Sequence, residues 1–160
     1  RRGRRLPEVA AGAGVARTFR VPRVFPAMTI FENVLVAVEQ GVRRKSLSWW
    51  QMIDKSYCVS RTEKLIQSAG LSDQSFTFAS DLSLYERRCL EIARGLAMDP
   101  RILLVDEPAD GIATHQQDML ASLLEEVCGR ELTVVLTSAS EGPLTEICDY
   151  TVSLSPHSVQ

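Results

Sequence analysis

Residues 102–107 read Ile102-Leu103-Leu104-Val105-Asp106-Glu107, an apolar run that ends directly in two carboxylates. Four apolar residues without alternation are typical of a strand that is covered on both faces of a parallel sheet. Such sheets present their ligand sites at the carboxyl ends of the strands, where Asp106 and Glu107 lie. The pair alone is equally compatible with an acidic turn, so the surrounding segments have to decide between the two interpretations.

The segments after this run complete a βαβ unit. The predicted elements are a helix over 114–127, a strand over 132–136, a short helix near 143–148 and a last strand over 150–154. A Thr-x-x-Gln capping box at Thr114 begins the first of these helices, and Gly129 ends it. Strands and helices that alternate in this way predict an α/β fold on a parallel sheet.

The segments before the run are mostly helical. The predicted elements are a short strand at 15–19, helices over about 30–40 and 48–69, and a helix between Ser83 and Asp99. Capping boxes at Thr29 and Ser83 mark two of the helix starts. On the helix after Ser83, the apolar residues share one face, and Arg88 and Glu91 are predicted to lie mostly on the other.

The length of 160 residues suits one domain. We divide the chain into a basic N-terminal segment over 1–14 and one domain over 15–160. The domain comprises a helical subdomain over about 21–97 and an α/β core over about 100–156.

The composition excludes several classes of protein. A net charge of −2 gives no long-range attraction to nucleic acid, so no nucleic-acid partner is predicted. The four cysteines are widely spaced without companion histidines, which indicates free thiols rather than a zinc site. No stretch approaches the roughly 20 apolar residues of a membrane-spanning helix.

The residues from Leu82 to Pro108 strongly resemble the signature-helix-to-Walker-B region of ATP-binding-cassette (ABC) ATPases. They contain Leu82-Ser83, the helical stretch 90–97 and the strand with its two carboxylates. The segments 14–19 and 28–34 look like the Q-loop region of the branched-chain amino acid importer group of that family. The resemblance covers nearly the whole chain.

This resemblance implies a partial RecA-like parallel sheet of the P-loop NTPase fold, with an inserted helical subdomain. It implies ATP and Mg²⁺ as cofactors. The implied partners are a membrane permease and another ABC ATPase subunit, in a homo- or heterodimer. The implied location is cytoplasmic, at the inner face of the cell membrane, and the implied role is import of branched-chain or similar amino acids.

The resemblance also assigns roles to individual residues. Asp106 would hold Mg²⁺, and Glu107 would be the general base that activates water. Ser83 of the signature motif, Arg20 of the Q-loop and Asp110 of the D-loop would contact ATP.

Several positions depart from the family pattern. No Gly-x-x-x-x-Gly-Lys-Ser/Thr loop occurs, so the chain is expected to be truncated at its amino end and to lack most of the affinity for phosphate. Arg20 replaces the Q-loop glutamine, Leu84-Tyr85-Glu86 replaces Gly-Gly-Gln of the signature, and Ala139 replaces the switch histidine. We therefore predict that the chain does not hydrolyse ATP alone.

Three hypotheses follow from the sequence. The first is an ABC ATP-binding subunit in the form of a fragment. The second is a degenerate module that docks on a permease or a sister subunit without hydrolysing ATP. The third is a truncated gene product without a stable function.

Overall fold

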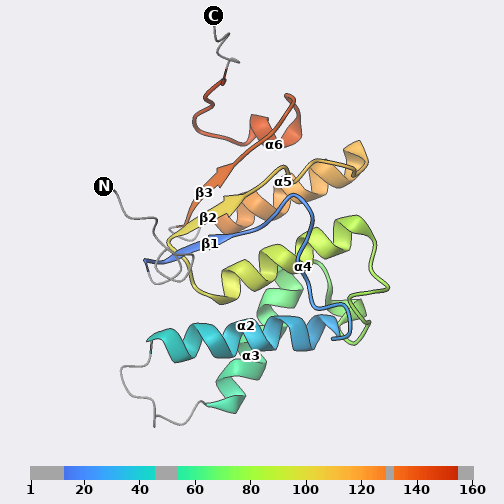
Figure 1. Ribbon diagram of the computed structural model, residues 1–160, viewed down its shortest axis with the longest axis vertical. Coiled ribbons are helices and arrows are strands. Elements are labelled where there is room, and N and C mark those ends of the chain that lie inside the picture. Colours follow the sequence, from blue (N-terminus) through green and yellow to red (C-terminus); the bar gives the residue numbers. More distant parts are fainter. Residues whose placement is uncertain (1–12, 46–53, 129–131, 155–160) are drawn as a thin grey trace, which may run out of the picture.

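The computed structural model describes residues 13–45, 54–128 and 132–154. The elements are β1 (Val15–Arg17), α2 (Ile30–Lys45), α3 (Lys55–Ser68), the 3-10 turn η1 (Ser72–Gln74), α4 (Leu84–Ala97), β2 (Ile102–Val105), α5 (Thr114–Cys128), β3 (Thr133–Leu136) and α6 (Pro143–Glu146). Figure 1 shows the strands and α5 at one end of the molecule and α2 and α3 at the other, with α4 between them.

The three strands form one parallel sheet in the order β1-β2-β3. Ala16, Leu103 and Val134 are register partners across it. All three strands lie where the sequence predicts them, although β1 is shorter than the predicted 15–19. The α/β expectation for this part of the chain is confirmed.

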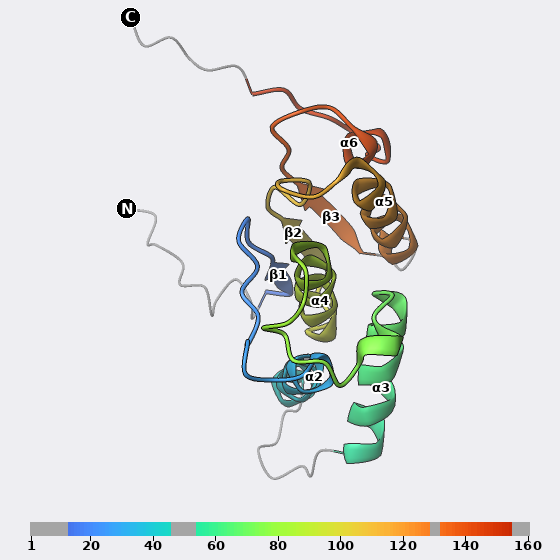
Figure 2. The same ribbon diagram turned by 90° about the vertical axis from the view of Figure 1, so that its right-hand side faces the viewer.

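Helices α4 and α5 lie on the same side of the sheet (Figure 2). Leu103 and Val105 are buried there, and α4 approaches so closely that a Cβ on Gly95 would lie 3.1 Å from Leu103 Cδ1. On the other face Ile102 is 37% exposed and Val135 is 50% exposed. The expectation that residues 102–105 are covered on both faces is therefore wrong for the described part of the chain, because no described helix packs on that second face.

The helical part is built by α2, α3 and α4, which pack against one another. The largest fully buried side chains, which join this part to the sheet, are Ile30, Ile66, Leu90, Ile92, Leu103, Leu120 and Leu124. The contact between α2 and α4 leaves no room for a side chain at Gly41, whose Cβ would lie 2.5 Å from the carbonyl oxygen of Ala97. Glycine at this position is thus a packing requirement of the helix crossing.

The capping boxes predicted at Thr29 and Ser83 are both present. At the start of α2, the Glu32 N–H donates to Thr29 Oγ1 at 3.2 Å and the Thr29 N–H donates to Glu32 Oε2 at 2.8 Å. Ser83 and Glu86 exchange the equivalent two bonds at the start of α4. These bonds satisfy amide groups that have no partner inside a helix.

The box predicted at Thr114 is wrong by one residue. Helix α5 begins at Thr114 itself, and the N–H of the preceding Ala113 donates to Gln116 Oε1 at 3.1 Å. The glutamine side chain therefore makes its half of the box, but the residue at the cap is an alanine without a hydroxyl.

The last strand predicted over 150–154 is also wrong. This segment forms no strand, and Tyr150, Val152 and Leu154 are 92%, 80% and 90% exposed. Alternating apolar residues favour a strand only where another strand is in reach for pairing, and none of the described strands pairs with this segment.

The other predictions concern the ends of two helices and segments that lie outside the described residues. The helix predicted over 30–40 extends to Lys45, and the one predicted over 48–69 is α3. Trp49 and Trp50, a pair that the sequence offers either as an anchor for a partner or as core packing, lie outside the described residues, as does most of the basic segment 1–14. The division into domains stays a prediction.

The four cysteines form no disulfide, and two of them, Cys58 and Cys89, are buried. Among the described residues no helix is long and apolar enough to cross a membrane.

We expect Gly41→Ala to lower the free energy of unfolding by about 1–3 kcal/mol, because the added methyl group must push α2 away from the backbone of α4. Denaturant titration followed by circular dichroism measures this. The control is Gln40→Ala at the exposed neighbouring position, for which a change below about 0.5 kcal/mol is expected. Equal effects of the two substitutions would contradict the packing argument.

Candidate functional site

Residues from the carboxyl ends of all three strands meet around Asp106. Its Oδ2 accepts a hydrogen bond from Arg17 Nη2 at 2.8 Å, and its Oδ1 accepts one from Thr137 Oγ1 at 3.0 Å. Its backbone N–H donates to Thr18 Oγ1 at 3.4 Å. The Arg17 guanidinium and then the Thr137 hydroxyl hold the pKa of Asp106 below its usual value. Asp106 is therefore an ionised carboxylate that groups from both neighbouring strands hold in place.

Glu107 lies beside Asp106 and shares the Thr137 hydroxyl with it. The Glu107 N–H donates to Thr137 Oγ1 at 3.0 Å, while Glu107 Oε2 accepts from the Ala139 N–H at 3.2 Å. At the position where the family pattern has a histidine, this chain thus offers a backbone amide. Glu107 has a φ of +46°, which residues with a Cβ rarely adopt.

Arg20 and Asp110 form the second arginine–aspartate pair of the site. Arg20 Nε lies 2.8 Å from Asp110 Oδ2, with the two side chains 65% and 45% exposed. The buried Arg88 donates to the backbone carbonyl of Asp110. The hydrogen bond from Arg20 lowers the pKa of Asp110. The two loops that follow β1 and β2 are therefore tied to each other.

Glu91 of α4 anchors the loop that follows β1. Only 7% exposed, its carboxylate accepts the backbone N–H groups of Phe19 at 3.2 Å and Arg23 at 2.9 Å. Burial raises the pKa of Glu91, and these two hydrogen bonds oppose that rise. The expectation that Arg88 and Glu91 lie on the outer face of the helix is wrong, because the loop after β1 takes up the Glu91 side chain and the loop after β2 takes up Arg88.

Ser83 lies apart from the two carboxylates, in its own capping box. Its hydroxyl donates to Glu86 Oε2 at 2.6 Å and accepts from the Glu86 N–H at 3.3 Å. The next residue, Leu84, packs against the loop of Asp110, since a Cβ on Gly111 would lie 3.0 Å from Leu84 Cδ2. The hydroxyl that the resemblance assigns to ATP is thus engaged inside the helix start.

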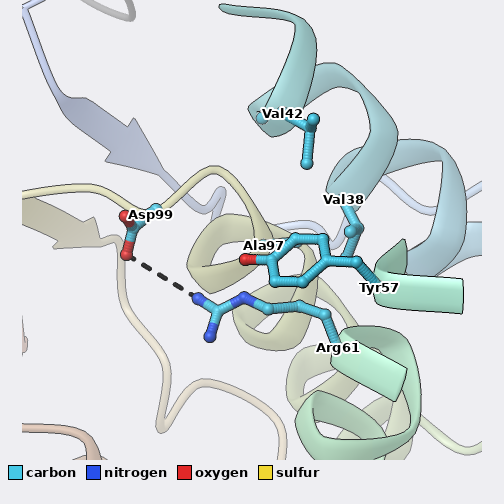
Figure 3. A pocket seen from close by; sticks show the side chains of 7 residues that line it. Val38, Val42, Tyr57, Arg61, Ala97 and Asp99 are labelled. Atoms are coloured by element: carbon cyan, nitrogen blue, oxygen red, sulfur yellow. Dashed lines mark ion pairs between the residues drawn. The ribbon is translucent and has the colours of Figure 1, made fainter. Parts of the chain in front are cut away.

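A shallow hollow lies between α2, α3 and the end of α4 (Figure 3). Val38, Val42 and Tyr57 form its wall, and Arg61 reaches Asp99 at 3.7 Å across it. Its volume of about 120 Å³ is well below the roughly 300 Å³ of the smaller ligand pockets. It also lies at the opposite end of β2 from the carboxylates, so it is not part of the site around Asp106.

The donors around Asp106 suit Mg²⁺, which prefers carboxylate and other oxygen ligands. Asp106 and Thr137 are the residues of this chain that would hold the ion. Among the described residues no group of three or more His, Cys, Asp or Glu side chains could hold a metal. A cation at Asp106 would therefore depend on further ligands such as water or phosphate.

The sequence identifies the two carboxylates but misses the residues that hold them. Arg17, Thr18 and Thr137 each stand at or just after the carboxyl end of a strand next to β2. That position was the available signal, because parallel strands end at one edge of the sheet. No comparable signal exists for Glu91, whose partners are backbone amides of a loop.

The chain is similar in sequence to known proteins of one family. A family model described as ABC transporter matches residues 4–110. The high-affinity branched-chain amino acid transport ATP-binding protein LivG of Escherichia coli (strain K12) is 33% identical over 131 residues, which cover 79% of this chain and 51% of that protein. The ribose import ATP-binding protein RbsA of Rhodococcus jostii (strain RHA1) is 25% identical over 89% of this chain and 27% of its own length. This chain spans about half the length, or less, of these relatives.

Solved structures show the same fold. The ADP conformation of MJ1267, an ATP-binding cassette of an ABC transporter, superimposes with a TM-score of 0.73 at 22% identity, covering 91% of this chain and 58% of that one. CbiO1 from Clostridium perfringens also gives a TM-score of 0.73, at 17% identity, covering 86% of this chain and 51% of that one. The predicted P-loop NTPase fold with a partial parallel sheet is confirmed.

We expect Thr137→Val to raise the pKa of Asp106 toward its usual value, because the carboxylate loses one hydrogen bond to its charged form. Ionised Asp106 contributes stability above its usual pKa, and this contribution is lost as the pH falls through the lowered pKa of the folded state. A carboxyl-carbon NMR titration measures the shift. The control, Thr133→Val at the other end of β3, should leave the Asp106 pKa unchanged, and an unchanged value in both variants would contradict the role of Thr137.

Proposed function

Because the chain belongs to the ABC transporter family, we propose that it is the ATP-binding component of an importer, or the part of one that carries the Walker B carboxylates. The observation that carries the proposal is the placement of Asp106 and Glu107 at the carboxyl end of β2, where both neighbouring strands contribute to holding them. The relatives named for branched-chain amino acid and ribose transport support import as the process. Branched-chain or similar amino acids are the substrate that we propose.

The proposed roles of the residues follow from their contacts. Asp106 would hold Mg²⁺, which when bound supplies positive charge beside the phosphates. Glu107 would accept the proton of the attacking water, since its carboxylate lies beside Asp106 and is held through Oε2 by the Ala139 amide. Arg20 would offer its guanidinium to a phosphate after leaving Asp110.

Apart from Arg20, the sequence provides few groups that would bind phosphate. None of its three lysines follows a glycine, so the nest of backbone amides and the lysine of a phosphate-binding loop are absent from these 160 residues. Glu86 further places a carboxylate at the start of α4, where an anion would otherwise be favoured. We therefore propose weak binding of ATP by this chain alone and no hydrolysis without a partner.

An exposed aromatic patch supports a membrane permease as the partner. Phe25, Phe76 and Phe78 are 44%, 80% and 50% exposed, and Phe31 stacks on Phe76 with ring centroids 6.0 Å apart. Aromatic side chains are enriched at the centres of protein interfaces, and exposed clusters of them mark such surfaces. The location that we propose is accordingly the cytoplasmic face of the membrane, beneath the permease.

A second candidate function is docking without catalysis. The observation that favours it is the state of Ser83, whose hydroxyl is engaged with Glu86 and followed by Leu84 instead of glycine. This arrangement removes the group by which a signature motif would contact the nucleotide of a sister subunit. In that case the aromatic patch is the functional surface, and Asp106 and Glu107 take no part in catalysis.

Titration of ATP with Mg²⁺ into the full chain, followed by calorimetry, separates the two functions. For the ATP-binding function we expect weak, saturable binding that Asp106→Asn with Glu107→Gln reduces by about tenfold, the usual effect of losing a charged contact. The control is Asp118→Asn with Glu126→Gln, which removes two carboxylates from α5. A folded chain that binds no ATP at millimolar concentration would exclude the ATP-binding function and leave the docking module.

A further inference from the structure

We propose that Arg17 is an internal counter-cation of Asp106. Its guanidinium occupies the place that a hydrated divalent cation would take at Asp106 and so sets the metal affinity of the site. The inference rests on the proposed nucleotide site, because it concerns the same carboxylate. It makes Arg17 a positioning residue that must move before the site can be loaded.

The contacts of Asp106 leave neither carboxylate oxygen without a partner. Arg17 Nη2 lies 2.8 Å from Oδ2, and the Thr137 hydroxyl lies 3.0 Å from Oδ1. A guanidinium at this distance neutralises the carboxylate and fills the space in which the water shell of a cation would contact it. A divalent cation and Arg17 therefore compete for Asp106.

The register of the sheet puts Arg17 there. Arg17 is the last residue of β1 and the register partner of Leu104. Side chains two residues apart on an extended segment point to the same face, so Asp106 follows Leu104 on the side of the sheet that carries Arg17. The Phe19 ring, 5.2 Å from the Arg17 guanidinium, supports the side chain, and Glu91 holds the backbone of Phe19.

The pair is exchangeable, because it is not buried. The side chains of Arg17 and Asp106 are 55% and 31% exposed, and ion pairs in contact with water are weak enough to be displaced. Arg17 thus raises the cation concentration that is needed to occupy the site, but it does not prevent cation binding. Arg20 makes a pair of the same length, but its partner is Asp110, so it has no direct contact with the metal position.

The test uses the metal alone. Mn²⁺ is titrated into the full chain without nucleotide, and free Mn²⁺ is measured by electron paramagnetic resonance. We expect Arg17→Gln to lower the Kd for Mn²⁺ by about tenfold, since the variant removes both the competing guanidinium and its repulsion of the cation. Arg17→Lys, which keeps the charge, should stay within about twofold of the wild type.

Two further variants show where the metal binds. In Arg17→Gln with Asp106→Asn, the gain in affinity should disappear. Arg23→Ala removes the other arginine that lies on Phe19, 4.5 Å from the ring centroid, and should leave the Kd unchanged. Far-ultraviolet circular dichroism confirms that each variant is folded, and Arg17→Ala serves if the glutamine variant is not.

Equal affinity of the wild type and Arg17→Gln would overturn the proposal. The same holds if the gain survives Asp106→Asn or appears in Arg23→Ala, because the effect would then be one of net charge. These outcomes differ from a failure of the proposed function, which is seen in the titration with ATP and not in the titration with metal alone.

Discussion

The buried carboxylate of Glu91 is the interaction on which the arrangement of the site depends. A charged group at 7% exposure is unfavourable unless hydrogen bonds compensate for the lost water, and the backbone amides of Phe19 and Arg23 provide them. These bonds fix the loop after β1 to α4. Since Arg20 directly follows Phe19, its position opposite Asp110 follows from a contact made in the helical part of the molecule, whereas the register of the sheet places Arg17.

In the resulting site, arginine side chains of the protein itself neutralise the aspartates. Arg17 at the end of β1 and Arg20 in the loop after it face Asp106 and Asp110, and Thr137 joins Asp106 to the backbone of Glu107. These contacts tie the loop after β1 to the loop after β2, and Glu91 and Arg88 tie the two loops to α4.

The elements with strong local signals were predictable from the sequence. The capping boxes at Thr29 and Ser83 place two helix starts correctly, and the apolar run 102–105 identifies the central strand. The errors arise where a distant partner decides the outcome. The segment 150–154 has the alternation of a strand, but none of the described strands pairs with it. Glu91 is buried where it accepts backbone N–H groups from a loop that is distant in the sequence. The carboxylates themselves were found, whereas Arg17 and Thr137 required the register of the sheet.

The left-handed backbone of Glu107 has a consequence for how this position can change. At a φ of +46° glycine or asparagine is at less steric disadvantage than a longer side chain with a Cβ, so stability alone would favour one of these two residues. A carboxylate that is retained there opposes that local preference. Stability and chemistry thus conflict at position 107, because replacing Glu107 by glycine or asparagine relieves the backbone strain but removes the carboxylate.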